Sequence, residues 1–186
     1  MKKLCIRPFN AKTKDLQETI DEYIWGYDDD TFESVIGRLL QNREATVSTA
    51  ESCTGGSIAK MIVSVPGSSA YFTGSVVAYD NSVKQSLLGV EQYSLDHFGA
   101  VSQPVVEQMA LGGLKLLGTD YCIATTGIAG PTGGSDEKPV GTTWIAVASR
   151  QDVVSKLLTL GDNRERNILR ASVAALNLLR EVLLAE

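Results

Sequence analysis

The sequence predicts an α/β domain, a three-layer α/β/α sandwich with a mixed β-sheet. Short segments rich in β-branched residues alternate with segments of helical periodicity, the pattern typical of strands joined by helices. Two adjacent β-rich segments near the carboxyl end are separated by a short turn and indicate a hairpin, which adds antiparallel pairing to the sheet. With 186 residues, 44% of them apolar and 21% charged, the chain has the size and composition of one ordinary globular domain.

The beginning of the chain differs from the rest. Residues 1–30 hold a short possible strand, a polar helix candidate and three consecutive aspartates, so we interpret them as an amino-terminal appendage. The main domain is expected over residues 31–186, opening with a helix capped by Asp30 or Thr31. The apolar positions of this helix follow the spacing of one buried face: Phe32, Val35, Ile36, Leu39 and Leu40.

The remaining elements follow from periodicity and from the Gly and Pro residues that interrupt it. The expected strands are residues 45–50, 71–79, 121–126, 141–149 and 152–160. The expected helices are residues 58–65, 82–88, 103–117 and 164–184. The last helix is expected to bury one side, made of Ile168, Leu169, Val173, Leu176, Leu179 and Leu183.

Charge and cysteine content exclude several classes of function. The formal net charge is -5 and no Lys/Arg-rich run occurs, which argues against nucleic-acid and membrane-surface binding. The three cysteines, Cys5, Cys53 and Cys122, form no CxxC pair, so neither a disulfide framework nor a metal site is predicted, and Cys122 is expected in the core. No segment approaches the ~20 apolar residues of a membrane span or resembles a signal peptide, so a cytoplasmic location is expected.

Ser52 is the first candidate for chemistry. It follows a predicted strand and opens a loop of small residues, 52–56, that leads into a helix. At such a transition a side chain is exposed at the sheet edge and the next N–H groups point toward negative charge, so the loop suits an oxyanion hole. Cys53 is a rival nucleophile, with nothing nearby to create its thiolate. Glu51 either orients an amide or pairs with a surface cation.

Three residues are candidates for the base that activates Ser52. His97 is the single histidine and leaves a Ser-His-Asp triad open, although its surroundings do not resemble an active-site loop. Lys60 lies ~12 Å along the same helix at 1.5 Å per residue, too far for direct proton transfer. Lys84 follows the next strand and reaches Ser52 if the two strands are neighbours; otherwise it is an exposed lysine.

Two further segments offer groups that bind oxygen atoms. The hydroxyls of Thr125–Thr126 precede the sharp turn Gly127–Pro131, which either binds ribose or phosphate or simply ends a strand. Arg164 stands at the start of the last helix, where it either clamps an anion or remains solvated. Asp162 or Asn163 is expected to cap this helix.

Six motifs occur in a fixed order: residues 49–56 (TAESCTGG), 66–69 (PGSS), 79–81 (YDN) with Lys84, 99–102 (GAVS), 126–131 (TGIAGP) and 137–141 (EKPVG). Together they resemble the carboxyl-terminal domain of the competence/damage-inducible protein CinA, which also exists as a stand-alone nicotinamide mononucleotide deamidase. The resemblance covers about residues 30–186.

The resemblance implies hydrolysis of the carboxamide of nicotinamide mononucleotide to nicotinate mononucleotide and ammonia, without a metal or a cofactor. Ser52 is then the nucleophile and Lys84 its base. A homodimer is expected by the same resemblance. The substrate-binding residues that it implies, together with the loop reasoning above, are Glu51, Thr54, Gly55, Gly56, Tyr79, Asn81, Thr126, Gly127 and Arg164.

The chain departs from the family pattern in two places. Asp80 stands where the family usually has serine, which is expected to change the environment of Lys84. Asn163 is an extra residue before Arg164 relative to the family pattern. Residues 1–30 resemble the segment that joins this domain to a nucleotide-processing domain in full-length CinA.

An alternative function of a different class is a non-catalytic nucleotide-sensing or interaction module in a competence or DNA-damage response. Such a module binds the nucleotide but releases no ammonia. The presence of Ser52 together with Lys84 favours the enzyme, because a pure binding module has no need of a nucleophile and a base.

Overall fold

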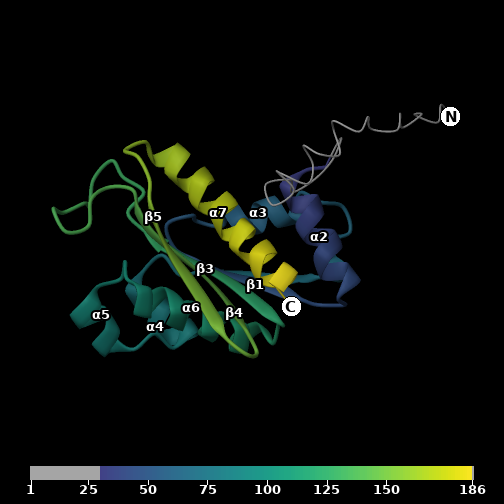
Figure 1. Ribbon diagram of the computed structural model, residues 1–186. Helices are drawn as coiled ribbons and strands as arrows, with labels where there is room; N and C mark the ends of the chain where they lie inside the picture. The colour runs from purple at the N-terminus through teal and green to yellow at the C-terminus, as the bar shows by residue number, and fades with distance from the viewer. Residues whose placement is uncertain (1–29, 186) are drawn as a thin grey trace.

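The computed structural model describes residues 30–185 and forms a five-stranded mixed sheet with helices on both faces (Figure 1). Of the predicted appendage over residues 1–30, residues 1–29 lie outside the described residues. The strands are β1 (Val47–Glu51), β2 (Phe72–Val77), β3 (Tyr121–Gly127), β4 (Thr142–Ser149) and β5 (Val153–Thr159), in the spatial order β2-β1-β3-β4-β5. The first three strands of this order are parallel and the last two pairings are antiparallel, which confirms the predicted α/β sandwich and its hairpin.

The helices form two layers (Figure 1). One layer contains α2 (Phe32–Asn42), α3 (Ser57–Val63) and α7 (Arg164–Ala185), and the other contains α4 (Asn81–Leu88), α5 (Gln92–Phe98) and α6 (Gln103–Leu117). The central strand β3 faces both layers: Ile123 packs into the core under α2, α3 and α7, whereas Cys122 and Ala124 pack into the core under α6. Successive side chains of a strand point to opposite faces, so a strand covered on both sides is apolar throughout.

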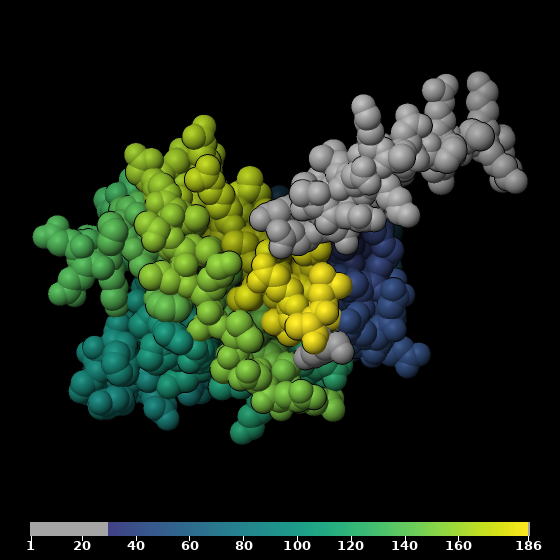
Figure 2. Space-filling model, viewed as in Figure 1, coloured from purple at the N-terminus to yellow at the C-terminus, as the bar shows by residue number. Residues whose placement is uncertain are grey.

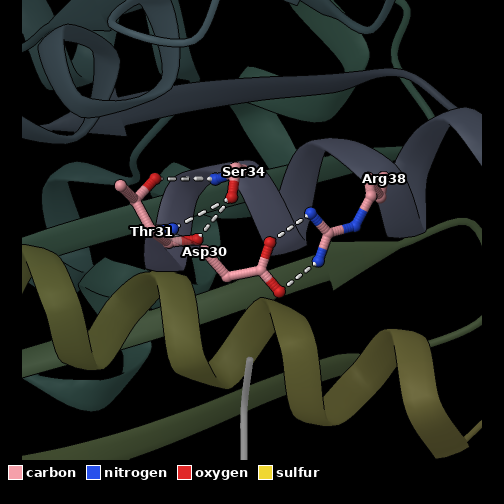
Figure 3. A network of polar contacts seen from close by, with 4 residues as sticks. All are labelled: Asp30, Thr31, Ser34 and Arg38. Atoms are coloured by element: carbon pink, nitrogen blue, oxygen red, sulfur yellow. Dashed lines mark hydrogen bonds and ion pairs between the residues drawn. The ribbon is translucent and has the colours of Figure 1, made fainter. Parts of the chain in front are cut away.

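Helix α2 begins with a capping box. The Thr31 hydroxyl accepts a hydrogen bond from the Ser34 N–H, and the Ser34 hydroxyl accepts one from the Thr31 N–H (Figure 3). Asp30 instead pairs in a bidentate manner with Arg38, two turns along the helix, at 2.6 and 2.8 Å (Figure 3). Thr31 is therefore the cap, and Asp30 fixes the path of the chain into the helix.

Two expectations about helices were wrong. Residues 92–98 form α5, which was not predicted because this short polar segment has too few apolar positions to establish a period. On α7, Leu169 and Val173 were expected to be buried but are 57% and 38% exposed. The buried side of the helix consists of Leu176, Leu179 and Leu183, as predicted, together with smaller residues that include Ala171 and Ala175 and let the backbone approach the strands closely.

The carboxyl ends of the three parallel strands lie together at one edge of the sheet. Glu51, the last residue of β1, is in register with Val77 of β2 and with Thr125 of β3. The loops that leave these strands therefore meet at a single edge, where α/β sheets commonly bind ligands. Within residues 30–185, no helix is both long and apolar enough to cross a bilayer.

The opposite layer depends on a close approach between α4 and α6. A Cβ atom placed on Gly112 of α6 would lie 1.9 Å from the carbonyl oxygen of Leu88, the last residue of α4. Only glycine fits there, because the contact is with backbone and cannot be relieved by moving a flexible side chain. This approach positions α4, and with it Lys84.

We expect Gly112→Ala to lower the free energy of unfolding by about 3 kcal/mol, because overpacking against a backbone atom forces the two helices apart. Urea denaturation measures the loss. Gly161→Ala is the matched control, since nothing lies within 4 Å of a Cβ at that position, and it should change stability by less than about 1 kcal/mol. Equal stability of the two variants would contradict the proposed contact.

Candidate functional site

A cavity of about 230 Å³ lies at the edge of the sheet where the parallel strands end. The segments around it leave β1, β2 and β3, together with the starts of α4 and α7 and the turn before α6. Its lining residues are Ser52, Cys53, Tyr79, Asn81, Lys84, Ala100, Val101, Thr126, Gly127, Ala129 and Arg164. Ser52 and Lys84 thus face the same cavity, together with Tyr79, Asn81, Thr126, Gly127 and Arg164 from the predicted set.

Ser52 is the first residue after β1. Its N–H donates to the carbonyl oxygen of Thr125 at 3.0 Å, which continues the ladder between β1 and β3 by one residue and fixes the serine backbone. The adjacent Cys53 also lines the cavity, but burial raises the pKa of its thiol to about 12. At neutral pH the thiol therefore keeps its proton, so Cys53 lacks the thiolate that a cysteine nucleophile requires.

Lys84 lies on α4 and is only 2% exposed. Its ammonium donates to the carbonyl oxygens of Ala78 at 2.9 Å and Tyr79 at 3.2 Å, both in the segment that leaves β2. Burial lowers the pKa of Lys84 below its ordinary value, because a charged ammonium is poorly solvated there. The expected condition for its approach to Ser52, that β2 neighbours β1, is met, although no hydrogen bond joins the two side chains.

Asp80 affects Lys84 through charge. Its side chain caps α4 by accepting from the N–H of Ser82 at 2.8 Å and from the Ser82 hydroxyl at 2.6 Å. These hydrogen bonds lower the pKa of Asp80, so it is ionised at neutral pH. Its negative charge raises the pKa of Lys84 and opposes part of the effect of burial.

The other two candidate bases lie away from the cavity. His97 is exposed on α5, where its Nδ1 lies 2.9 Å from the Tyr93 carbonyl oxygen and its ring stacks on Tyr93. Lys60 is exposed on α3, as expected for a solvated residue. Neither residue lines the cavity, so the geometry favours Lys84 among the three.

Glu51 is neither a cavity residue nor a partner of a surface cation. Its side chain is fully buried beneath the loop. Its two carboxylate oxygens accept one hydrogen bond of 3.2 Å from the Thr49 hydroxyl and four of 2.7 to 3.1 Å from the chain that follows. The donors of these four are the hydroxyl of Thr54 and the N–H groups of Gly56, Ile58 and Ala59. A carboxylate at the start of α3 satisfies N–H groups that have no partner within the helix. The structure thus assigns Glu51 a supporting position.

Thr54, Gly55 and Gly56 also lie outside the lining of the cavity. Thr54 is buried between Glu51 and Thr125, with its hydroxyl bonded to both side chains. Gly55 and Gly56 adopt left-handed backbone conformations, with φ of 61° and 94°, that turn the chain from β1 into α3. The expected contact of these three residues with substrate is therefore not supported by their location.

Hydrogen bonds within the protein also narrow the set of oxyanion donors. The N–H groups of Ser52, Gly55 and Gly56 donate to Thr125, Ser52 and Glu51 respectively. The N–H groups of Cys53 and Thr54 have no acceptor among the described residues. Of the loop 52–56, which was expected to supply oxyanion donors, these two N–H groups are the ones that remain available for a ligand.

Successive side chains of β3 point to opposite faces of the sheet, so Thr126 and Thr125 have different neighbours. The Thr126 side chain lies at the cavity and its hydroxyl donates to the Ala100 carbonyl oxygen at 2.8 Å. The neighbouring Thr125 instead bonds with Thr54 on the buried side. Thr126 therefore links β3 to the turn before α6, whereas Thr125 supports the Ser52 loop.

Arg164 and Tyr79 meet at the mouth of the cavity, and both are exposed. The guanidinium donates to the Gly130 carbonyl oxygen at 2.9 Å and to the Tyr79 hydroxyl at 3.3 Å. Asn163 caps α7 by accepting from the N–H of Arg166 at 3.0 Å. Asn163 therefore acts as the helix cap, and Arg164 lines the cavity.

Ala100, Val101 and Ala129 also line the cavity but were not among the predicted site residues. Their side chains carry no reactive group, so residue chemistry offers no signal for them. The motif 99–102 was the available indication, since it stands before a helix in the same way as the serine loop. Among residues 30–185, no cluster of three or more His, Cys, Asp and Glu residues suits a metal ion.

Comparison with known proteins agrees with this architecture. Residues 29–183 match the family model described as the CinA C-terminal domain. A CinA-like protein from Gloeothece citriformis is 50% identical over 169 residues, and one from Cytophaga hutchinsonii is 47% identical over 165 residues; each match covers 89% of this chain. The chain spans about 40% of the length of these curated relatives.

Solved structures share the same fold. A CinA superfamily protein from Klebsiella pneumoniae superposes with a TM-score of 0.80 at 32% identity, covering 83% of this chain and 97% of that one. The competence/damage inducible protein CihA from Agrobacterium tumefaciens gives a TM-score of 0.77 at 37% identity, covering 84% of this chain and 98% of that one. The family model, the sequence relatives and the shared fold together establish that this chain belongs to the CinA C-terminal domain family.

Proposed function

We propose that the chain is an amidohydrolase that converts nicotinamide mononucleotide to nicotinate mononucleotide and ammonia, with Ser52 as nucleophile and Lys84 as base. The observation that carries the proposal is the shared cavity: the Ser52 hydroxyl and a buried lysine with a lowered pKa face it from neighbouring segments. A lysine that loses its proton more easily than usual is able to accept the proton of a serine hydroxyl.

In the proposed reaction, Ser52 Oγ attacks the carboxamide carbon while its proton moves to the neutral Lys84 amine. The tetrahedral intermediate collapses when Lys84 returns this proton to the leaving nitrogen, and ammonia departs. The product of this half-reaction is an ester between Ser52 and the nicotinate group. Water, deprotonated by Lys84, then attacks the ester carbon, and the proton passes back to Ser52 Oγ as the bond to the acyl group breaks. The carboxylic acid that is formed loses its remaining proton to solvent and leaves as nicotinate mononucleotide.

The negative oxygen of the intermediate requires hydrogen-bond donors fixed before the reaction. The N–H groups of Cys53 and Thr54 suit this role, because they follow the nucleophile directly and have no acceptor within the described protein. The residue after the nucleophile commonly supplies such a donor when the serine stands between a strand and a helix. Glu51 supports the arrangement by holding the start of α3 from the buried side.

The mouth of the cavity suits the nucleotide part of the substrate. Arg164 offers a guanidinium whose planar donors match phosphate oxygens. Tyr79 and Asn81 contribute a hydroxyl and an amide, which are suited to ribose hydroxyls. A site with its nucleophile inside and its cation at the mouth favours an amide that carries a phosphate some distance from the reacting carbon.

The decisive experiment is to incubate the purified protein with nicotinamide mononucleotide and follow the release of ammonia. Nicotinamide riboside is the control that lacks the phosphate, and it should react more slowly if Arg164 binds that group. Binding of the nucleotide without ammonia release would instead favour the non-catalytic nucleotide-sensing module.

Removal of either proposed catalytic group should abolish turnover without unfolding the protein. We expect Ser52→Ala and Lys84→Arg each to lower kcat by about 10³-fold or more. The arginine variant tests the base specifically, because a guanidinium keeps a positive charge and does not give up its proton near neutral pH. Ammonia release measures activity, and circular dichroism verifies the fold.

The matched controls are Cys53→Ala, which removes the rival nucleophile, and Lys60→Ala, which removes the exposed lysine on α3. Both should keep kcat within about threefold of the unaltered protein, well under the 1.4 kcal/mol that a tenfold change represents. Near-normal turnover by Ser52→Ala, or loss of turnover in Cys53→Ala, would overturn the assignment of the nucleophile.

The proposed base predicts the pH dependence. Activity should rise with pH through the pKa of Lys84, because only the neutral amine accepts a proton, and this pKa lies below the ordinary lysine value. Asp80→Ser keeps a capping hydroxyl but removes the negative charge that favours the ammonium, so the rising limb should move to lower pH. The profile of kcat/KM against pH measures both effects. A shift toward higher pH would contradict the role of Asp80.

The buried carboxylate predicts a stability effect. Glu51→Gln replaces one acceptor oxygen with an NH₂ group that faces N–H donors, so the free energy of unfolding should fall by about 3 kcal/mol. Glu165→Gln is the matched control, since Glu165 is an exposed carboxylate in the first turn of α7, and its loss should be about 1 kcal/mol or less. Urea denaturation compares the two variants. Similar losses would show that burial of Glu51 adds nothing.

A further inference from the structure

The excursion over residues 131–139 contains most of the motif EKPVG, to which the proposed function assigns no role. It projects from the molecule beside α5 (Figure 2). Its base is closed by two backbone hydrogen bonds, from Gly141 N–H to the Ile128 carbonyl at 2.8 Å and from Ile128 N–H to the Thr142 carbonyl at 2.9 Å. The base therefore joins the cavity wall formed by Gly127 and Ala129.

The other end of the excursion is held at α5 by Lys138. This side chain is half-buried in an otherwise exposed stretch, and its Nζ donates to the carbonyl oxygen of Phe98 at 2.6 Å. Phe98 is the last residue of α5, where helix carbonyls lack partners and attract a cation. A Cβ on the next residue, Gly99, would lie 3.3 Å from the ammonium, so glycine leaves the space that the lysine occupies.

The contact belongs to a larger pattern in the turn before α6. Three successive carbonyl oxygens of this turn each accept a hydrogen bond from a side chain, and the three donors come from different parts of the chain. The pairs are Lys138 to Phe98, Ser102 to Gly99 and Thr126 to Ala100, at 2.6, 2.8 and 2.8 Å. By contrast, the N–H groups of Ala100 and Val101 have no acceptor among residues 30–185.

Ala100 and Val101 both line the cavity, so their free N–H groups are the polar groups that this wall has available for a ligand. Fixed carbonyls hold the orientation of the peptide units, and free N–H groups in such a turn attract oxygen atoms that carry negative charge. Lys138 is the one fully charged donor of the three, so its hydrogen bond is expected to be the strongest.

We propose that Lys138 is a positioning residue, which holds the Phe98 carbonyl so that the N–H groups of Ala100 and Val101 donate to oxygen atoms of the bound substrate. The excursion acts as a strap between two segments that adjoin cavity residues: its base pairs with Ile128, which lies between Gly127 and Ala129, and Lys138 binds the end of α5 just before Ala100. This inference rests on the proposed function for the identity of the substrate but concerns a contact that exists without it.

The kinetic test uses Lys138→Met, which keeps the length of the side chain and removes the charge. The KM for nicotinamide mononucleotide should rise about tenfold, the factor that corresponds to about 1.4 kcal/mol, while kcat stays within about threefold. Lys138→Arg should restore the KM, since arginine also donates to a carbonyl oxygen. Lys156→Met, at an exposed lysine of β5, is the control and should behave like the unaltered protein. An unchanged KM in Lys138→Met would overturn the proposal.

Hydrogen exchange separates failure of this inference from failure of the proposed function. Without any substrate, the Gly99 amide, which donates to the Leu95 carbonyl oxygen at 3.1 Å, should exchange about tenfold faster in Lys138→Met than in the unaltered protein. This factor corresponds to a loss of about 1.4 kcal/mol in local stability at the end of α5. If the unaltered protein releases no ammonia, the proposed function fails and the exchange experiment still tests the strap. Identical exchange in the two proteins would overturn the positioning role of Lys138.

Discussion

The carboxylate of Glu51 lies buried at the junction of β1 and α3 and accepts four hydrogen bonds from the chain that follows it. A buried charge is stable only when its hydrogen bonds are satisfied, so this junction has one favourable conformation. That conformation turns the chain through two left-handed glycines and leaves Ser52 at the cavity. It also uses the Gly56 N–H internally while those of Cys53 and Thr54 remain free. The candidate nucleophile and its nearest donors therefore depend on a residue outside the cavity.

Burial and nearby charge have opposite effects on the pKa of Lys84. Burial lowers the pKa of its ammonium, whereas the carbonyl oxygens of Ala78 and Tyr79 and the charge of Asp80 favour the charged form. The lysine is therefore held in a defined place by carbonyl groups and yet releases its proton more easily than an exposed lysine. Both properties suit a base beside a serine hydroxyl, and both depend on the packing of α4 against α6 through Gly112.

Much of this arrangement was predictable from the sequence because it rests on local chemistry. Helical spacing predicted α2 and α6, β-branched segments predicted the strands, and small residues between a strand and a helix indicated the loop at Ser52. The helical rise between Ser52 and Lys60 excluded Lys60 as the base, and the exposed position of Lys60 on α3 agrees with that exclusion. Periodicity predicted only part of the buried side of α7. Leu176, Leu179 and Leu183 are buried as expected, whereas Leu169 and Val173 are exposed and alanines complete the buried side.

By itself, the sequence determined the α/β class and the loop that contains Ser52, because these depend on residue type and short-range spacing. Spacing left Lys84 as one of three candidate bases, and the resemblance to the CinA family made it the preferred one. Only the tertiary structure decided that Glu51 supports the loop from below and that Lys138 reaches the end of α5. Such contacts join residues whose backbone directions are fixed by distant packing. A local sequence pattern does not show which hydrogen-bond donors and acceptors are already paired within the folded protein. Those pairings decide which groups remain to bind a substrate.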